Sequence, residues 1–193
     1  MPLQNRVLPT GEIVADPARG LFTGNRGCLH DDQKRLGRVR WKGKAWIICA
    51  LEFKGWKRQV MSPQTWTELF LLDEAVALAA GHRPCALCRR AAYVGYRDAW
   101  GGQPKAAQMD AALHGARLGA RVRGNCLDLP DGAFVRQDGR AFLLHGETML
   151  PYDPAGYGCA IARVRGEVEV LTPGPSMAVL RAGYRPILHP TAT

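Results

Sequence analysis

Apolar and polar residues along this chain follow two different periods, which together predict both strands and helices. Residues 45–53 combine β-branched and aromatic side chains between two glycines, which predicts a strand. Residues 57–61 are expected to pair with it as a hairpin, and residues 38–41 to add an edge strand. Residues 1–37 contain many glycines and little periodicity, so we expect irregular structure there, with one short strand at most.

Three helices are predicted in the centre of the chain. The first begins after Asp73, a good N-cap residue, and ends before Gly81, which suits the position that follows a helix. A second helix is expected to begin near Cys85 and to run to about Trp100. A third is expected over residues 105–120, where apolar residues fall on one face.

The polar face of the third helix carries candidate catalytic residues. Asp110 and His114 are four residues apart and Arg117 follows three residues later, so the three side chains share one face. A carboxylate beside an imidazole can act as a general base or as a second metal site, and an arginine beside them can bind phosphate. The alternative is a solvated helix face with a local ion pair.

The last third of the chain changes character toward short strands. Residues 132–135 and 141–144 flank an Asp-Gly pair at residues 138–139, which predicts a β-hairpin. Residues 167–171 predict a further strand, and Ser176 can cap a short final helix.

Composition adds limits on the kind of protein. The chain has 193 residues, of which 47% are hydrophobic, so it can form one core or a small metal-dependent unit joined to a second small domain. No stretch approaches the roughly 18 apolar residues of a membrane span, and the N-terminus lacks the apolar core of a signal peptide. We therefore expect a cytoplasmic protein without a membrane partner. Its six cysteines would stay reduced there, as ligands, nucleophiles or core residues rather than disulfides.

The pair Cys85-Ala86-Leu87-Cys88 is the strongest chemical signal in the sequence. Two cysteines separated by two residues can chelate one metal ion, and a helix start favours the thiolate form that zinc requires. A redox pair is a second interpretation, although no thioredoxin-like pattern precedes it. Two buried core cysteines are a third.

Residues 73–90, which include this cysteine pair, resemble part of a known family. A helix is followed by Ala-Gly, one further residue, Arg-Pro-Cys, two residues and Cys, which resembles the second half of the Ada-type metal-binding domain. That family is named for a bacterial protein that repairs methylated DNA phosphates. In this chain, His82 replaces the family's aromatic residue. The resemblance implies a small β-hairpin and helices folded around tetrahedral zinc.

The family supplies its other two thiolates from an upstream Cys-x3-Cys pair, which this chain lacks. By resemblance, the strand residue Cys49 is the expected third ligand. For the fourth ligand of a tetrahedral zinc site we favour His30, with Cys28 or a water molecule as alternatives. In the family, one upstream thiolate accepts a methyl group, and we do not carry this activity over, because an imidazole ligand would make the site less nucleophilic.

The charge of the chain points to a polyanionic partner. The net charge is +9, and the segment Lys34–Arg58 contains nine basic residues and one acidic residue. Such an excess attracts nucleic acid, and the tryptophans in and near the segment can stack on bases or belong to the core. The predicted nucleic-acid contacts are Arg38, Arg40, Lys42, Lys44, Lys54, Lys57, Arg58, Arg83, Arg89 and Arg90.

These expectations combine into an α+β fold, with an Ada-like zinc-binding unit over residues 1–104 and a helix plus a small β-rich region over residues 105–193. The leading hypothesis is a zinc-binding, DNA- or other nucleic-acid-associated protein in DNA repair or the damage response. One alternative is an enzyme on nucleic acid (a nuclease, base-processing or alkyl-acceptor protein) that uses Asp110 and His114. The other is a zinc-folded module for protein interaction.

Overall fold

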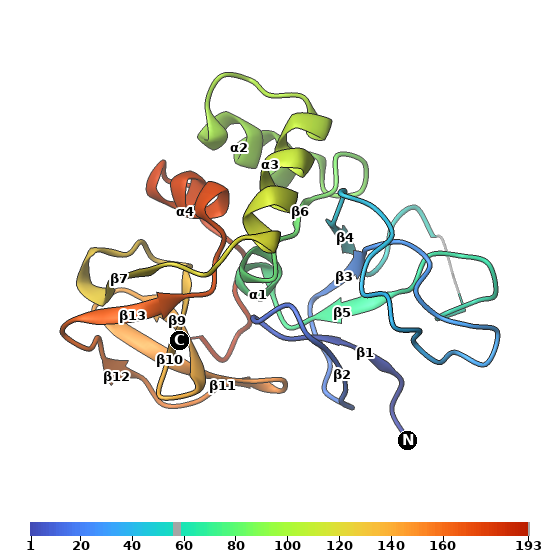
Figure 1. Ribbon diagram of the computed structural model, residues 1–193, viewed down its shortest axis with the longest axis horizontal. Helices are drawn as coiled ribbons and strands as arrows, with labels where there is room; N and C mark the ends of the chain where they lie inside the picture. The colour runs from blue at the N-terminus through green and yellow to red at the C-terminus, as the bar shows by residue number, and fades with distance from the viewer. Residues whose placement is uncertain (56–58, 193) are drawn as a thin grey trace.

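The protein has two β-sheets at opposite ends of the molecule, with helices between and above them (Figure 1). A computed structural model describes residues 1–55 and 59–192. Helices and sheets occur together along the chain, so the predicted α+β class is confirmed. No helix in the described part of the chain combines the length and apolar character needed to cross a bilayer.

The first sheet is mixed and has the strand order β2-β1-β5-β3-β4-β6. Its strands are β1 (Gln4–Val7), β2 (Ile13–Ala15), β3 (Phe22–Asn25), β4 (Ile47–Ala50), β5 (Leu69–Leu71) and β6 (Arg83–Pro84). The pairs β1–β5 and β4–β6 are parallel, and the other pairs are antiparallel. The N-terminal region therefore contributes three strands where irregular structure was expected. Each has only three or four residues, too few for an alternating pattern to stand out.

Strand β4 does not form the hairpin expected from the sequence. Its neighbours are β3 and β6, which approach it from distant parts of the chain. Residues 59–61 and 38–41 form no strand, and residues 57–58 of the expected partner lie outside the described residues. The register of β4 with β6 places Ile48 opposite Pro84, so Cys49 lies next to Cys85.

The second sheet is antiparallel and has the order β11-β10-β9-β8-β13-β7, with β12 beside β10. Its strands are β7 (Arg123–Asn125), β8 (Phe134–Gln137), β9 (Arg140–His145), β10 (Thr148–Asp153), β11 (Gly156–Tyr157), β12 (Ile161–Ala162) and β13 (Glu167–Val170). A 3-10 turn, η1 (Cys126–Asp128), follows β7. The predicted hairpin is confirmed: Asp138 and Gly139 both have positive φ (49° and 77°), as a two-residue type I′ turn requires.

Four α-helices join the sheets: α1 (Glu74–Ala79), α2 (Arg90–Trp100), α3 (Ala106–Leu118) and α4 (Gly174–Arg181). The predicted cap is present, because the Asp73 carboxylate accepts a hydrogen bond of 2.9 Å from the backbone N–H of Val76. Helix α2 begins at Arg90 rather than near Cys85. Residues 86–89 form turns, and this later start leaves both cysteines on a loop.

The core runs across the boundary expected at residues 104 and 105. One cluster of buried side chains includes Val7 and Ile48 from the first sheet, Tyr96 from α2, and Val168 from the second sheet. The two sheets are thus sides of a shared interior, to which α1 and α2 contribute from the middle.

Two buried ion pairs fix the segment between β6 and α2. Nε and Nη2 of Arg83 donate to the two carboxylate oxygens of Asp110 on α3, each at 2.8 Å. Nη1 of Arg89 donates to Glu74 on α1 at 2.8 Å, and the Tyr184 hydroxyl donates to the same oxygen at 2.7 Å. All four charged side chains are at least nine-tenths buried. Because an unpaired buried charge is costly, these pairs specify where the segment lies.

Replacing Asp110 with Asn should therefore destabilise the protein. The substitution leaves the buried Arg83 guanidinium without its counter-charge, which typically costs about 3–5 kcal/mol. Urea unfolding followed by circular dichroism would measure the loss. Asp98→Asn is the matched control, because Asp98 is half exposed and lies 3.7 Å from Arg97, and it should cost at most about 1 kcal/mol. Equal losses in the two variants would contradict the assignment.

Candidate metal centre

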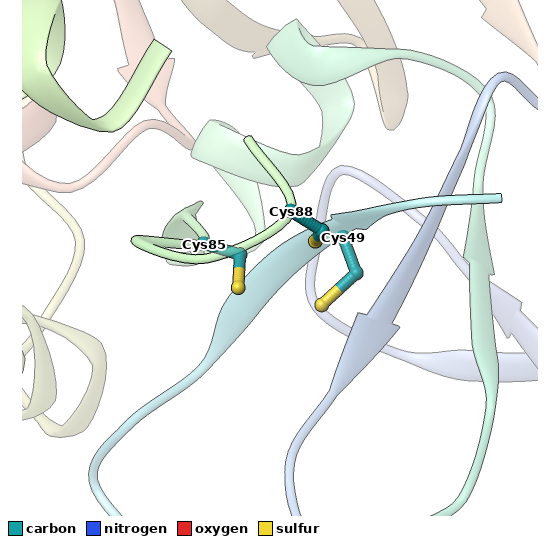
Figure 2. A group of neighbouring side chains, drawn as sticks. All are labelled: Cys49, Cys85 and Cys88. Atoms are coloured by element: carbon teal, nitrogen blue, oxygen red, sulfur yellow. The ribbon is translucent and has the colours of Figure 1, made fainter. Parts of the chain in front are cut away.

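Three cysteines meet between the edge of the first sheet and the loop that precedes α2. Cys49 projects from β4, and Cys85 and Cys88 come from residues 85–89, here called the thiol loop (Figure 2). Their Sγ atoms all lie within 4.8 Å of one another. Sulfurs around a tetrahedral zinc ion, with bonds of about 2.3 Å, are about 3.8 Å apart. The observed spacing therefore fits a metal ion with small adjustments.

Backbone hydrogen bonds place and polarise these sulfurs. The N–H groups of Leu87 and Ala50 donate to the sulfurs of Cys85 and Cys88, respectively, each at 3.4 Å. The N–H of Cys85 donates to the Ile48 carbonyl at 2.9 Å, which ties the thiol loop to β4. Donors aimed at sulfur favour the thiolate, the form that binds metal.

The three thiols differ in pKa because they are hydrogen-bonded to one another and partly buried. Hydrogen bonds from the Cys49 thiol and from backbone N–H groups lower the pKa of Cys85 to about 5. The pKa of Cys49 is raised, first by its hydrogen bond to Cys85 and then by burial and by the neighbouring thiolate charges. Burial also raises the pKa of Cys88. Without a cation the cluster thus favours one negative charge, and a divalent metal would offset the repulsion among three.

The three cysteines face a cavity of about 300 Å³. Its other walls include Phe53, Trp66 and Phe70, and the carboxylate of Glu68, which accepts a hydrogen bond of 2.7 Å from the backbone N–H of Met61. In the described parts of the chain no fourth His, Cys, Asp or Glu joins the cluster at the same spacing. Zinc held by three protein ligands accepts water or substrate as its fourth ligand, and this cavity provides the room.

His30, the favoured fourth ligand, is placed elsewhere. Its Nδ1 lies 2.7 Å from the Thr67 hydroxyl and its Nε2 lies 3.1 Å from the Ser62 carbonyl, so both ring nitrogens have protein partners. The Cys28 thiol donates to the His30 carbonyl at 3.8 Å and is also outside the cluster. The expected ligand set is corrected to Cys49, Cys85 and Cys88, with the fourth position left to water or substrate.

The candidate catalytic residues of α3 are not part of the cysteine cluster, and both have protein partners. Both oxygens of Asp110 are occupied by Arg83, so this carboxylate is a structural partner and a poor general base. His114 lies edge-on to Trp41, with ring centroids 4.6 Å apart, and its Nδ1 is 3.4 Å from Nη2 of Arg117. Desolvation and the positive charges of Arg117 and Lys44 lower the pKa of His114.

The basic residues divide into two groups. Arg83 and Arg89 are buried in ion pairs, so their expected role in nucleic-acid contact is corrected to holding the thiol loop. Lys57 and Arg58 lie outside the described residues. The exposed members are Arg38, Arg40, Lys42, Lys44, Lys54 and Arg90. Which arginines are buried could not be predicted from the sequence, because their burial depends on acidic partners distant in the chain.

Metal content should follow the three clustered cysteines. Cys85→Ser and Cys88→Ser should each remove most of the zinc from purified protein, because two ligands hold the ion poorly. Cys28→Ser, a change of the same chemistry outside the cluster, should retain it, as should Cys159→Ser at an exposed site. Elemental analysis by mass spectrometry would measure the metal-to-protein ratio. Loss of zinc from the Cys28→Ser variant, with zinc retained by the Cys85→Ser and Cys88→Ser variants, would contradict the assigned ligand set.

Zinc affinity should rise steeply with pH. At neutral pH Cys85, with its pKa near 5, is already ionised, whereas Cys49 and Cys88 have raised pKa values and hold their protons. Binding then releases two protons, so affinity should rise about a hundredfold per pH unit near neutrality. Competition with a chromophoric chelator between pH 6 and 8 would measure this slope. A pH-independent affinity would show that the thiols are not the ligands.

Comparisons of the chain with known protein families, with curated proteins and with solved structures found no match.

Proposed function

We propose that this protein binds zinc through Cys49, Cys85 and Cys88 and associates with nucleic acid. The convergence of three thiols from two distant segments is the observation that carries the proposal. Thiolate ligands suit zinc, Cu(I) and iron–sulfur clusters, and a mononuclear site with backbone donors on its sulfurs suits zinc. Reduced thiols are needed for this chemistry, which supports a cytoplasmic location.

The exposed basic residues support the nucleic-acid part of the proposal. Arg38, Arg40, Lys42 and Lys44, here called the basic strip, lie on the loop that joins β3 to β4. The strip is anchored, because the Lys42 N–H donates to the Arg26 carbonyl at 2.8 Å and Nη2 of Arg117 donates to the Lys44 carbonyl at 2.8 Å. Cationic side chains on a fixed loop can neutralise successive phosphates.

The basic strip and the metal ligand Cys49 belong to one continuous segment. Two residues separate Lys44 from the first residue of β4, Ile47, and Cys49 follows within that strand. Metal binding would therefore stabilise the loop end that carries the positive charges. Together with the resemblance of residues 73–90 to the Ada-type domain, this arrangement supports a role in DNA repair or the damage response.

A second candidate function is an enzyme that acts on nucleic acid through the metal. The cavity of about 300 Å³ beside the three thiols favours it, because an open coordination position admits water or a substrate atom. Cys49, Cys85 and Cys88 would hold the ion, which would supply Lewis acidity. Asp110 is excluded from a catalytic part by its buried pair with Arg83.

Charge reversal in the basic strip should weaken nucleic-acid binding and its dependence on salt. The double variant Lys42→Glu/Lys44→Glu removes two exposed cations, so the slope of log K against log salt should fall by about 0.7–0.9 per lost phosphate contact. Fluorescence anisotropy with a labelled oligonucleotide at several salt concentrations would measure it. Arg165→Glu, at an exposed site in the bend between β12 and β13, serves as the control. If wild-type protein bound no oligonucleotide at low salt, the nucleic-acid proposal would fail and a protein partner would remain.

A further inference from the structure

A second and larger cavity lies away from the thiols, between the first sheet, α3 and the junction of β13 with α4. Its volume is about 830 Å³, which is within the range of sites for nucleotide-sized ligands. Four arginines line it, Arg26, Arg40, Arg117 and Arg121, against one acidic residue, Glu12. We infer that this arginine cavity binds a phosphate-bearing ligand of mononucleotide size.

Arg26 lies at the floor of the arginine cavity and is 1% exposed. Its Nη1 donates to the Gly11 carbonyl at 2.8 Å and its Nε donates to Nε2 of His82 at 3.2 Å, while Nη2 has no hydrogen-bond partner among the described residues. Burial, together with the nearby Arg117 charge, lowers the pKa of Arg26 to about 9, which still leaves it charged at neutral pH. A buried cation with an unused donor is a strong sign of a missing anion.

Arg117 adds a second cation beside the first. The guanidinium carbons of Arg26 and Arg117 lie 3.9 and 4.1 Å from the centroid of the Trp46 ring. Arg117 donates to the carbonyls of Gly81 and Lys44, at 2.6 and 2.8 Å, and its Nε has no hydrogen-bond partner in the part of the chain that the structure describes. Neither arginine forms an ion pair with a carboxylate among the described residues.

The groups around this pair offset little of its charge. The Asp110 carboxylate raises the pKa of Arg117, but both of its oxygens accept hydrogen bonds from Arg83. The ring nitrogen Nε2 of His82 accepts from Arg26, so His82 is neutral, and burial with the two arginine charges lowers its pKa well below the usual value. Glu12 accepts a hydrogen bond from the Thr10 hydroxyl at 3.0 Å and pairs with no arginine in the described parts of the chain. A site that holds two adjacent cations without acids is stabilised by an incoming anion.

The remaining walls define the chemistry of the ligand. Gly174, the first residue of α4, lines the cavity, and among the described residues no side chain caps this helix, so the positive end of its dipole faces this region. Apolar walls from Ile13, Val122 and Leu171 suit a base or another flat apolar group. A ligand that joins an anionic group to an apolar group, such as a nucleoside phosphate, would place its anion at the arginines and its apolar group against these walls. Free nucleotides and the phosphorylated ends of strands share this chemistry.

Calorimetry on the zinc-loaded protein at low salt, with inorganic phosphate, adenosine 5′-monophosphate and adenosine as probes, tests the inference. Adenosine monophosphate should bind saturably and more weakly as salt rises, phosphate should bind more weakly than the nucleotide, and adenosine should not bind measurably. Absence of saturable binding by both phosphate and the nucleotide would overturn the proposal. Competition by a 5′-phosphorylated but not an unphosphorylated oligonucleotide would identify strand ends as the source, and no competition by either would identify free nucleotides.

Variants at the mouth of the cavity keep the test independent of folding. Arg40→Gln should weaken nucleotide binding about tenfold, the usual effect of losing one charged hydrogen bond, because Arg40 is exposed and its loss leaves no buried charge. Arg165→Gln, outside the cavity, should leave binding unchanged. Equal effects in both variants would count against the site. The variant Lys42→Glu/Lys44→Glu should still bind the nucleotide, which separates this inference from the oligonucleotide binding proposed above.

Discussion

The thiol loop is held at both ends by an arginine that is buried against a carboxylate. Arg83, before the loop, pairs with Asp110 on α3, and Arg89, the last residue of the loop, pairs with Glu74 on α1. A buried ion pair adds little net stability, yet breaking one is costly, so such pairs act mainly by excluding other arrangements. Here they set the position of Cys85 and Cys88 relative to β4, and hence the distance to Cys49.

The same network connects the metal centre to the second sheet. Glu74 also accepts from the Tyr184 hydroxyl and from the backbone N–H of Ile187, and Asp73 accepts from the Tyr157 hydroxyl at 2.7 Å. The C-terminal segment is therefore bonded to the helix that precedes the thiol loop. Buried side chains from both sides of residue 104 pack together in each of the two core clusters.

Positive charge has two distinct roles in this protein. Arg83 and Arg89 are neutralised in the interior, whereas Arg26 and Arg117 are partly or wholly buried around Trp46 and form no ion pair with a described carboxylate. Net charge and local composition do not distinguish these cases, since all four arginines stand among apolar and polar neighbours in the sequence. The positions of the carboxylates, which lie on other elements, decide which arginines form ion pairs within the protein and which could pair with a bound anion.

Local signals in the sequence were sufficient for elements whose cause is local. The Asp73 cap, the Asp138-Gly139 turn and the third helix follow from a few neighbouring residues, and the spacing of the Cys85-x-x-Cys88 pair alone predicts that both thiols can face one metal ion. The partners of β4, the later start of α2, the exclusion of His30 from the thiols and the arginine cavity depend on contacts between residues far apart in the chain. Such contacts arise from the packing of the whole core, and a short stretch of sequence does not contain both of the residues that make each contact.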